Sequence, residues 1–412
     1  MINSSVIGYS SLIPLIRSVG PVFLTILLVK FLPKVDYGFF VYCFGVIGVL
    51  LSVSSLNLMY SMQVVLNKKN VSSSEVAESV FGFKLIVTIS VGLLYTYFLF
   101  VTDNITRTTF LLINVLLLLR VVNDYIFGYT RAICAFKQQF IFTIFEQLLF
   151  VGCIFVISLL GNLDITTTFI CYLVCQIVAI MGYLLFLSNG LFRLFPIKFS
   201  FIKVKTLLLI GLPMLPFTFS DLIVSSFFPQ IIYTKFGGVE AADYAVGQKI
   251  AMLIIFPAMI LNNFYLQRLT RSYEDSYRNF IVTLGIFFAV YLSSIVVIYF
   301  LLSLFSNFII TTLFDADYLM SGLVAQVLMS TYTLITLSSV VSGYFAVLNR
   351  TKIVAYIWIA VFIAFFLCFY TINFSGYIAL IMTYNYILFI AFLLLIFLVV
   401  KDYVYARAVE SS

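Results

Sequence analysis

The sequence predicts an all-α, polytopic membrane protein with twelve transmembrane helices in two six-helix halves. Hydrophobic residues make up 63% of the 412 residues and charged residues only 9%, whereas a water-soluble domain carries about 25% charged residues. The apolar runs are continuous and about as long as the 20 residues that a helix needs to cross the hydrocarbon core. A transmembrane β-barrel would instead need short strands of alternating polarity.

Short polar stretches divide the first half of the chain. The first break combines Pro33 with two lysines, and the second is the lysine- and serine-rich stretch Asn67–Ser79. Such stretches interrupt apolar helices because proline lacks a backbone donor and charged residues favour water. The six segments expected here are Leu12–Leu32, Phe39–Leu66, Val80–Val101, Thr109–Phe127, Phe140–Leu160 and Ile165–Leu187.

The second half divides in the same way, at a Gly-Gly connection, a charged stretch from Arg268 to Arg278 and three short turns. Its expected segments are Leu207–Ile232, Ala245–Leu266, Phe280–Leu304, Leu323–Leu348, Ile353–Ile372 and Tyr377–Val400. The predicted organisation is a first lobe over 1–190, a basic cytoplasmic linker over 191–206, a second lobe over 207–400 and a cytoplasmic tail over 401–412.

The distribution of lysine and arginine predicts that both termini lie in the cytoplasm. With that orientation, fifteen of the 23 basic residues fall in inside connections or the tail, four in outside connections and four inside spans. Cytoplasmic connections of membrane proteins carry such an excess. Adding or removing one helix would destroy the alternation, which supports the count of twelve.

The connections between the expected spans, together with the composition, argue against several functional classes. All are short, and no GxxxxGK[ST] run indicates an ATP site. Histidine is absent, which removes the usual zinc ligand and catalytic base. The basic residues are scattered, so the net charge of +7 does not indicate nucleic-acid binding. We therefore expect neither an enzyme nor a metal or organic cofactor, and we expect the six cysteines to pack between helices.

Two connections echo one another. The stretch KFLPKVDYG (Lys30–Gly38) and the stretch KFGGVEAADYA (Lys235–Ala245) both begin with Lys-Phe and end with Asp-Tyr before a small residue. This similarity indicates an internal repeat. Because six is an even number of crossings, both halves begin on the same side of the membrane and have the same orientation. In such repeats the substrate site lies at the interface between the halves.

The first segment with Arg17, followed by KFLPKVDYGFF, resembles the oligosaccharide flippases of bacterial polysaccharide biosynthesis. These belong to the multidrug/oligosaccharidyl-lipid/polysaccharide (MOP) exporter superfamily. LLLIGLPMLPFTFSDLIV is similar to the family's proline-bearing seventh helix, GGVEAADYAVGQKI to the start of the eighth and LFDADY to the entry into the tenth. The resemblance spans essentially the whole chain. In one departure, Phe228-Pro229-Gln230 occupies the region where many relatives carry an Asp-Arg pair, so the role of that pair cannot be transferred.

The resemblance implies a MOP/MATE-like fold with a central cavity between two lobes. It also implies alternating-access transport of an O-antigen or capsule repeat unit on an undecaprenyl-diphosphate type of lipid. The movement would run from the cytoplasmic to the outer leaflet of the bacterial inner membrane. The implied partners are this lipid-linked oligosaccharide, membrane lipids, and the polymerase and chain-length machinery of the same pathway. Coupling by antiport to a proton or sodium gradient is expected, without a bound cofactor.

Seven charged residues lie inside expected spans. A charge at the bilayer centre costs about 2.5–3.5 kcal/mol on insertion scales, so seven of them indicate a polar path inside the bundle. Four are basic, which modestly favours an anionic substrate. The seven are Arg17, Lys84, Arg120, Asp124, Glu146, Asp221 and Lys249.

The four cations are candidates for binding the diphosphate headgroup. Arg17 and Arg120 suit it because a guanidinium matches phosphate oxygens in pairs. A structural ion pair or snorkelling is the alternative for Arg17, and an i,i+4 pair with Asp124 is the alternative for Arg120. Lys249 reaches either the headgroup or the outer interface. Lys84 lies only one turn inside its segment, which favours snorkelling to the cytoplasmic surface.

The three buried carboxylates, Glu146, Asp221 and Asp124, are candidates for ion coupling. A carboxyl group in a low dielectric can exchange protons near neutral pH. Pro213 and Pro216 precede Asp221, and they should bend the helix and free carbonyls around it. The alternative role of the carboxylates is charge balance for neighbouring cations.

Three other classes of membrane protein fit the sequence less well. A multidrug or organic-cation exporter of the same superfamily would need a net-acidic cavity. A membrane glycosyltransferase or polymerase would carry large outside loops or acidic clusters, whereas the pair Asp315 and Asp317 lies in a short connection. A major-facilitator carrier would show a basic signature in the stretch Asn67–Ser79, where it is missing.

Overall fold

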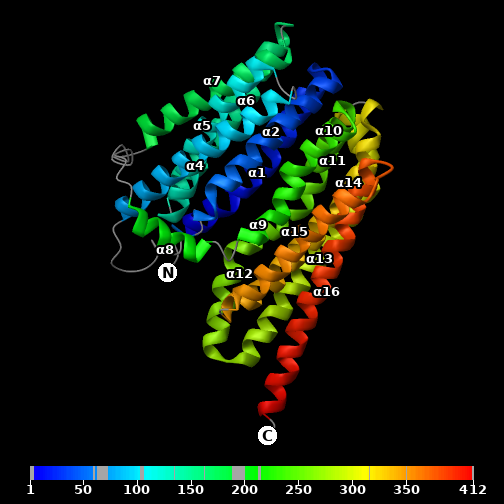
Figure 1. Cartoon of the computed structure of the whole chain (residues 1–412). Helices are drawn as coiled ribbons and strands as arrows, with labels where there is room; N and C mark the ends of the chain where they lie inside the picture. Colours follow the sequence, from blue (N-terminus) through cyan, green and yellow to red (C-terminus); the bar gives the residue numbers. More distant parts are fainter. Residues whose placement is uncertain are drawn as a thin grey trace. The chain divides into compact units, whose positions relative to one another are not determined.

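The computed structural model describes residues 4–58, 61–62, 73–102, 106–133, 135–161, 163–187, 200–211, 215–314, 316–348 and 350–410. Within these ranges every regular element is a helix (Figure 1). Nine of the described helices are long and apolar enough to cross a membrane. The predicted all-α, multi-pass membrane fold is confirmed.

Helices lie at all six segments expected in the first half, but the second ends at Ser55, inside the span expected over Phe39–Leu66, where Leu56 and Asn57 adopt left-handed backbone angles. The helices are α1 (Ser4–Phe31), α2 (Lys34–Ser55), α4 (Ser73–Val101), α5 (Arg107–Ala132), α6 (Phe136–Leu159) and α7 (Ile165–Gly182), the last continued by the π-helical η1 (Tyr183–Leu187). Asp164 begins α7 with a capping box, in which its carboxylate accepts from the backbone N–H of Thr167 at 2.6 Å. A side-chain acceptor at this position satisfies an N–H that has no partner within the helix.

The second half contains interrupted as well as continuous helices. The seventh expected segment comprises α8 (Phe201–Gly211), α9 (Leu215–Leu222), η4 (Ile223–Phe227) and α10 (Phe228–Lys235), and the eighth comprises α11 (Gly238–Ala251), η5 (Met252–Ile255) and α12 (Phe256–Asp275). The remaining elements are α13 (Tyr277–Leu313), η6 (Ala316–Tyr318), α14 (Met320–Val347), α15 (Thr351–Thr371) and α16 (Tyr377–Glu410).

Proline explains the interruptions, which the single helices expected for these segments did not include. A proline inside a helix removes one hydrogen bond and its ring clashes with the carbonyl four residues earlier. For Pro229 that carbonyl lies in the π-helical turn η4, and for Pro257 it lies in the 3₁₀ turn η5. Pro213 lies outside the described residues, and Pro216 is the second residue of α9.

The chain packs into two units. The first contains Met1–Leu215 and Leu222–Ala242, and the second contains Pro216–Asp221 and Asp243–Ser412. This division differs from the boundary expected at 191–206, because α8 packs on α4 and α10 packs on α2. Residues 191–199 of the expected linker lie outside the described residues.

Helix α2 forms the centre of the first unit, where it packs against α1, α4, α5, α7 and α10. Glycines allow the close approach of its neighbours. A Cβ added at Gly38 would overlap the carbonyl oxygen of Gly238, and one added at Gly48 would overlap the hydroxyl of Ser226. Gly38 and Gly238 belong to the two stretches that echo each other in sequence. The helix starts within these two stretches therefore meet inside one unit.

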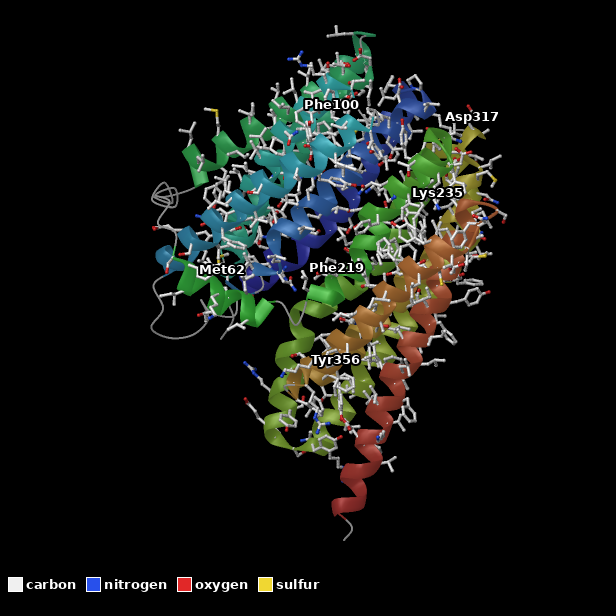
Figure 2. The ribbon with its side chains drawn as sticks, viewed as in Figure 1. Met62, Phe100, Phe219, Lys235, Asp317 and Tyr356 are labelled. Atoms are coloured by element: carbon white, nitrogen blue, oxygen red, sulfur yellow. The ribbon has the colours of Figure 1, made fainter. Side chains whose placement is uncertain are left out.

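Helix α14 forms the centre of the second unit, packed against α12, α13, α15 and α16. The short α9 joins this unit through Phe219, labelled in Figure 2, whose ring centroid lies 5.2 Å from that of Phe362 on α15. The hydroxyl of Tyr384 donates to the backbone carbonyl of Ser220 at 3.0 Å. These contacts fix the backbone next to Asp221.

Candidate functional site

Five of the seven predicted buried charges come together in the first unit. Arg17 comes from α1, Lys84 from α4, Arg120 and Asp124 from α5, and Glu146 from α6. On α5, residues 120, 123 and 124 share one face because they are three and four positions apart. Helix α1 packs closely on α6, and a Cβ at Gly20 would lie 2.6 Å from Oε1 of Gln147.

Lys84 and Asp124 form an ion pair between α4 and α5. The lysine side chain is fully buried, and Ser55 donates a second hydrogen bond to the same carboxylate oxygen at 3.5 Å. The expectation that Lys84 snorkels to the cytoplasmic surface is therefore wrong. The ammonium turns inward because a carboxylate on the neighbouring helix compensates its burial, which would be costly without a partner.

Glu146 is held by two amide side chains and one guanidinium. Its Oε1 accepts from Nδ2 of Asn123 at 2.8 Å and from Nε2 of Gln176 at 2.6 Å. Nη1 of Arg120 lies 3.6 Å from the same oxygen. Among the described residues, Arg120 thus forms a salt bridge with Glu146 on α6, and Asp124 forms one with Lys84 on α4. The alternative of a pair between Arg120 and Asp124 within α5 is not formed.

Arg17 is placed differently from the other two cations. Its guanidinium carbon lies 3.7 Å over the ring centroid of Phe127, a cation–π contact that orients the group. The salt bridges formed among the described residues do not include Arg17. A second such contact places the guanidinium carbon of Arg120 4.8 Å from the ring of Tyr172.

A cavity of about 210 Å³ opens between α1, α2 and α5. Its charged lining consists of Arg17, Arg120 and Asp124, and the carboxylate of Asp124 is already paired with Lys84. Apolar and small residues of α2 complete the wall together with Asn123. The full lining is Arg17, Phe44, Ile47, Gly48, Leu51, Arg120, Asn123 and Asp124. With three cations against two carboxylates in the cluster, the arrangement favours an anion.

The other two predicted residues, Asp221 and Lys249, lie in the second unit. Asp221 is exposed at the end of α9, within electrostatic reach of the hydroxyls of Tyr244, Tyr332 and Tyr384. Lys249 is half-buried on α11. The structure therefore brings together the five charges of the first half of the chain and gives Asp221 a separate, tyrosine-rich surrounding.

Two polar contacts were not predicted. Gln176, an isolated amide in the apolar helix α7, completes the coordination of Glu146. In the second unit, buried Asp243 accepts from the hydroxyl of Ser321 at 3.1 Å. An isolated amide or carboxyl in an apolar run is a usable signal, because an unsatisfied polar group in a membrane costs free energy.

No protein family and no curated protein matches this sequence. Solved structures do match its fold. An outward-facing multidrug resistance MATE family transporter of the MOP superfamily aligns with a TM-score of 0.64 and 15% identity over 96% of each chain. The inward-facing conformation of such a transporter aligns with a TM-score of 0.63 and 15% identity over 97% of this chain and 96% of the other.

A third structure is described as a MOP superfamily transporter from Pyrococcus furiosus Vc1 whose reverse polarity of the binding pocket suggests a different function. It aligns with a TM-score of 0.60 and 16% identity over 95% of this chain and 94% of the other. At these identities the likeness concerns the fold. The protein is a multi-pass membrane protein with the helical fold of the MATE transporters of the MOP superfamily.

Proposed function

We propose that this protein is a flippase for a polyprenyl-diphosphate-linked oligosaccharide, an O-antigen or capsule repeat unit. It would carry the headgroup from the cytoplasmic to the outer leaflet of a bacterial inner membrane by alternating access, with both termini in the cytoplasm. The observation that carries the proposal is the cavity of the first unit, in which Arg17 faces open space without a carboxylate partner among the described salt bridges.

The chemistry of the cavity matches a diphosphate. Ion pairs to Lys84 and Arg120 take up the charges of Asp124 and Glu146, so an entering cation would meet no free carboxylate there. An entering anion would meet Arg17, whose guanidinium can donate two parallel hydrogen bonds to phosphate oxygens. The apolar wall that α2 contributes to the cavity lowers the local dielectric, so the attraction between opposite charges is stronger there than in bulk water.

Ion coupling would use the carboxylates. Oε1 of Glu146 contacts the side chains of Asn123, Gln176 and Arg120. Protonation of the Glu146 carboxylate would weaken all three contacts and so free Arg120 to bind the substrate. Antiport with protons or sodium ions through Glu146 or Asp221 follows as a proposal. The partners would be the lipid-linked substrate, the surrounding lipids, and the polymerase and chain-length machinery of the same pathway.

A multidrug exporter of the same fold is the competing function. It would place an organic cation against a carboxylate, and Asp221 in the second unit is exposed and takes part in none of the salt bridges among the described residues. The cavity of the first unit argues for the anion. The two functions differ in a direct measurement, since only the exporter would confer resistance to cationic drugs that depends on Asp221.

The test uses inverted inner-membrane vesicles loaded with a radiolabelled lipid-linked repeat unit. At matched abundance, Arg17→Ala and Arg120→Ala should each reduce translocation at least 10-fold, because a charge-assisted hydrogen bond contributes about 1.5–3 kcal/mol. Arg350→Ala is the matched control, since it removes an arginine from an exposed pair with Asp402. Unchanged translocation in both cavity variants would show that the cationic cavity does not carry the substrate.

A further inference from the structure

Three of the six cysteines gather between α6 and α7. Sγ of Cys153 lies 2.7 Å from Sγ of Cys171, and Sγ of Cys175 lies 3.6 Å from the carbonyl oxygen of Leu149. Cys171 and Cys175 are buried and Cys153 is half-buried. The expectation that the cysteines only pack between helices does not account for two sulfur atoms this close together.

The register of the helix pair places the two cysteines at one depth. Helices α6 and α7 pack against each other and are joined by the short connection 160–164. Cys153 lies six residues before the end of α6, and Cys171 lies six residues after the start of α7. Both are therefore about 9 Å from the connected ends of the two helices, at 1.5 Å per residue. Their proximity follows from the helix hairpin itself as well as from side-chain placement.

We propose that Cys153 and Cys171 form an oxidisable thiol pair that closes to a disulfide. The oxidant would be a low-molecular-weight disulfide. One cysteine thiolate attacks it, forms a mixed disulfide and expels the first thiol; the second cysteine thiolate then attacks the cysteine sulfur and expels the second thiol. The two cysteines lose two electrons and two protons in total, and the reagent disulfide becomes two thiols.

The bond would act on the site already described. Glu146 lies seven residues before Cys153 on α6, and Gln176 lies five residues after Cys171 on α7; the two are joined by the hydrogen bond of 2.6 Å. A covalent link one to two turns away fixes the two helices against each other and so holds this hydrogen bond in place. Oxidation would therefore restrain the part of the first unit that positions Arg120.

The test treats the full-length protein in membrane vesicles with dipyridyl disulfide, blocks the remaining thiols with a maleimide and analyses the protein by peptide mass spectrometry. A linked peptide pair joining Cys153 to Cys171, lighter by two hydrogens and separated by dithiothreitol, is the expected result. Thiopyridone release should reach two equivalents for each linked pair.

Two variants separate this chemistry from general thiol reactivity. Cys171→Ser should leave the pyridyl group on Cys153 and release one equivalent. The double variant Leu148→Cys with Cys153→Ala keeps the thiol count on α6 but turns one thiol about 140° around the helix, at about 100° per residue, toward the exposed position of Leu148. It should form no link to Cys171.

The proposal is overturned by any of three results. One is a pyridyl adduct that persists on wild-type Cys153 while Cys171 stays open to the maleimide. Another is a link from Cys153 to Cys175 in place of Cys171. The third is a link in the Leu148→Cys control as abundant as in the wild type. Because the readout is covalent, these results are independent of whether the protein transports a lipid-linked oligosaccharide.

Discussion

Lys84 and Asp124 form an ion pair whose two ends lie in different surroundings. The lysine side chain is 0% exposed, whereas 42% of the aspartate side chain is exposed, and Asp124 lines the cavity. The pair therefore connects the packed interior of the first unit to the space in which we propose that the substrate binds. It also prevents Asp124 from presenting an uncompensated negative charge to an anion.

Removing one partner of this pair should destabilise the protein. Lys84→Met leaves Asp124, whose side chain is 42% exposed, without its counter-charge, so the loss should lie between the roughly 1 kcal/mol of exposed pairs and the roughly 3–5 kcal/mol of fully buried ones. The double variant Lys84→Met with Asp124→Leu should recover most of this loss because neither charge remains. Thermal unfolding in detergent measures both effects. A loss below about 1 kcal/mol for Lys84→Met would place the pair among weak, solvent-exposed ones.

Replacing Glu146 by glutamine should separate folding from coupling. The amide keeps the size of the side chain and an oxygen that accepts from Asn123 and Gln176, so abundance should be near normal. Arg120 loses the charge that lies 3.6 Å away. Transport by Glu146→Gln should no longer respond when an imposed pH gradient is collapsed, whereas the wild type slows. If the variant still responds as the wild type does, Glu146 has no coupling role, and Asp221→Asn becomes the variant to measure.

Gly38→Ala should disturb the centre of the first unit. The added Cβ would overlap the backbone carbonyl of Gly238, which cannot move without shifting the start of α11. Gly152→Ala on α6 is the matched control, since its Cβ meets nothing within 4 Å and a helical Gly→Ala change is worth about 0.5–1 kcal/mol of stability. Membrane abundance and unfolding temperature should fall only for Gly38→Ala. Equal behaviour of the two variants would contradict the close approach.

Asp164 should stabilise the start of α7 in a pH-dependent way. Hydrogen bonds from the hydroxyl and the backbone N–H of Thr167 hold the pKa of Asp164 below its usual value. The stabilisation is thus fully present above the unfolded pKa of about 3.9 and is lost as the pH falls through the lower folded pKa.

The variant Asp164→Ala measures this effect, since the loss of an N-cap costs about 1 kcal/mol. The difference in unfolding temperature between wild type and variant should be constant near neutral pH and should shrink in acid. Asp317, an exposed acidic residue in a short 3₁₀ turn, provides the control substitution Asp317→Ala. A difference that does not change with pH would remove the carboxylate cap as its cause.

The helices of this protein were predictable because a membrane imposes the length and polarity of each segment. Helices lie at all twelve expected segments, and the buried charges of the first half do face the interior of one unit. The interruptions at η4 and η5 were missed, although Pro229 and Pro257 provide the physical signal. The boundary between the two units also depends on packing, since α10 packs against α2 and belongs to the first unit although it lies in the second half of the chain.

The pairing of the charges could not be predicted from one sequence. The i,i+4 spacing favours Arg120 with Asp124, but a lysine on α4 and a glutamate on α6 provide better partners. Which partners meet depends on the rotation and depth of neighbouring helices. Neither quantity is fixed by apolar segments whose boundaries are uncertain by one turn. The approach of Cys153 to Cys171 was missed for the same reason.

The most direct test of the central claim is the binding of a short-chain polyprenyl diphosphate to the purified protein in nanodiscs, compared with the corresponding polyprenyl alcohol. The wild type should prefer the diphosphate. Arg17→Ala should lose about 10- to 100-fold in affinity for it, as expected for a charge-assisted contact of about 1.5–3 kcal/mol, and should bind the alcohol as before. If Arg17→Ala binds the diphosphate as tightly as the wild type does, the cavity between α1, α2 and α5 is not the headgroup site.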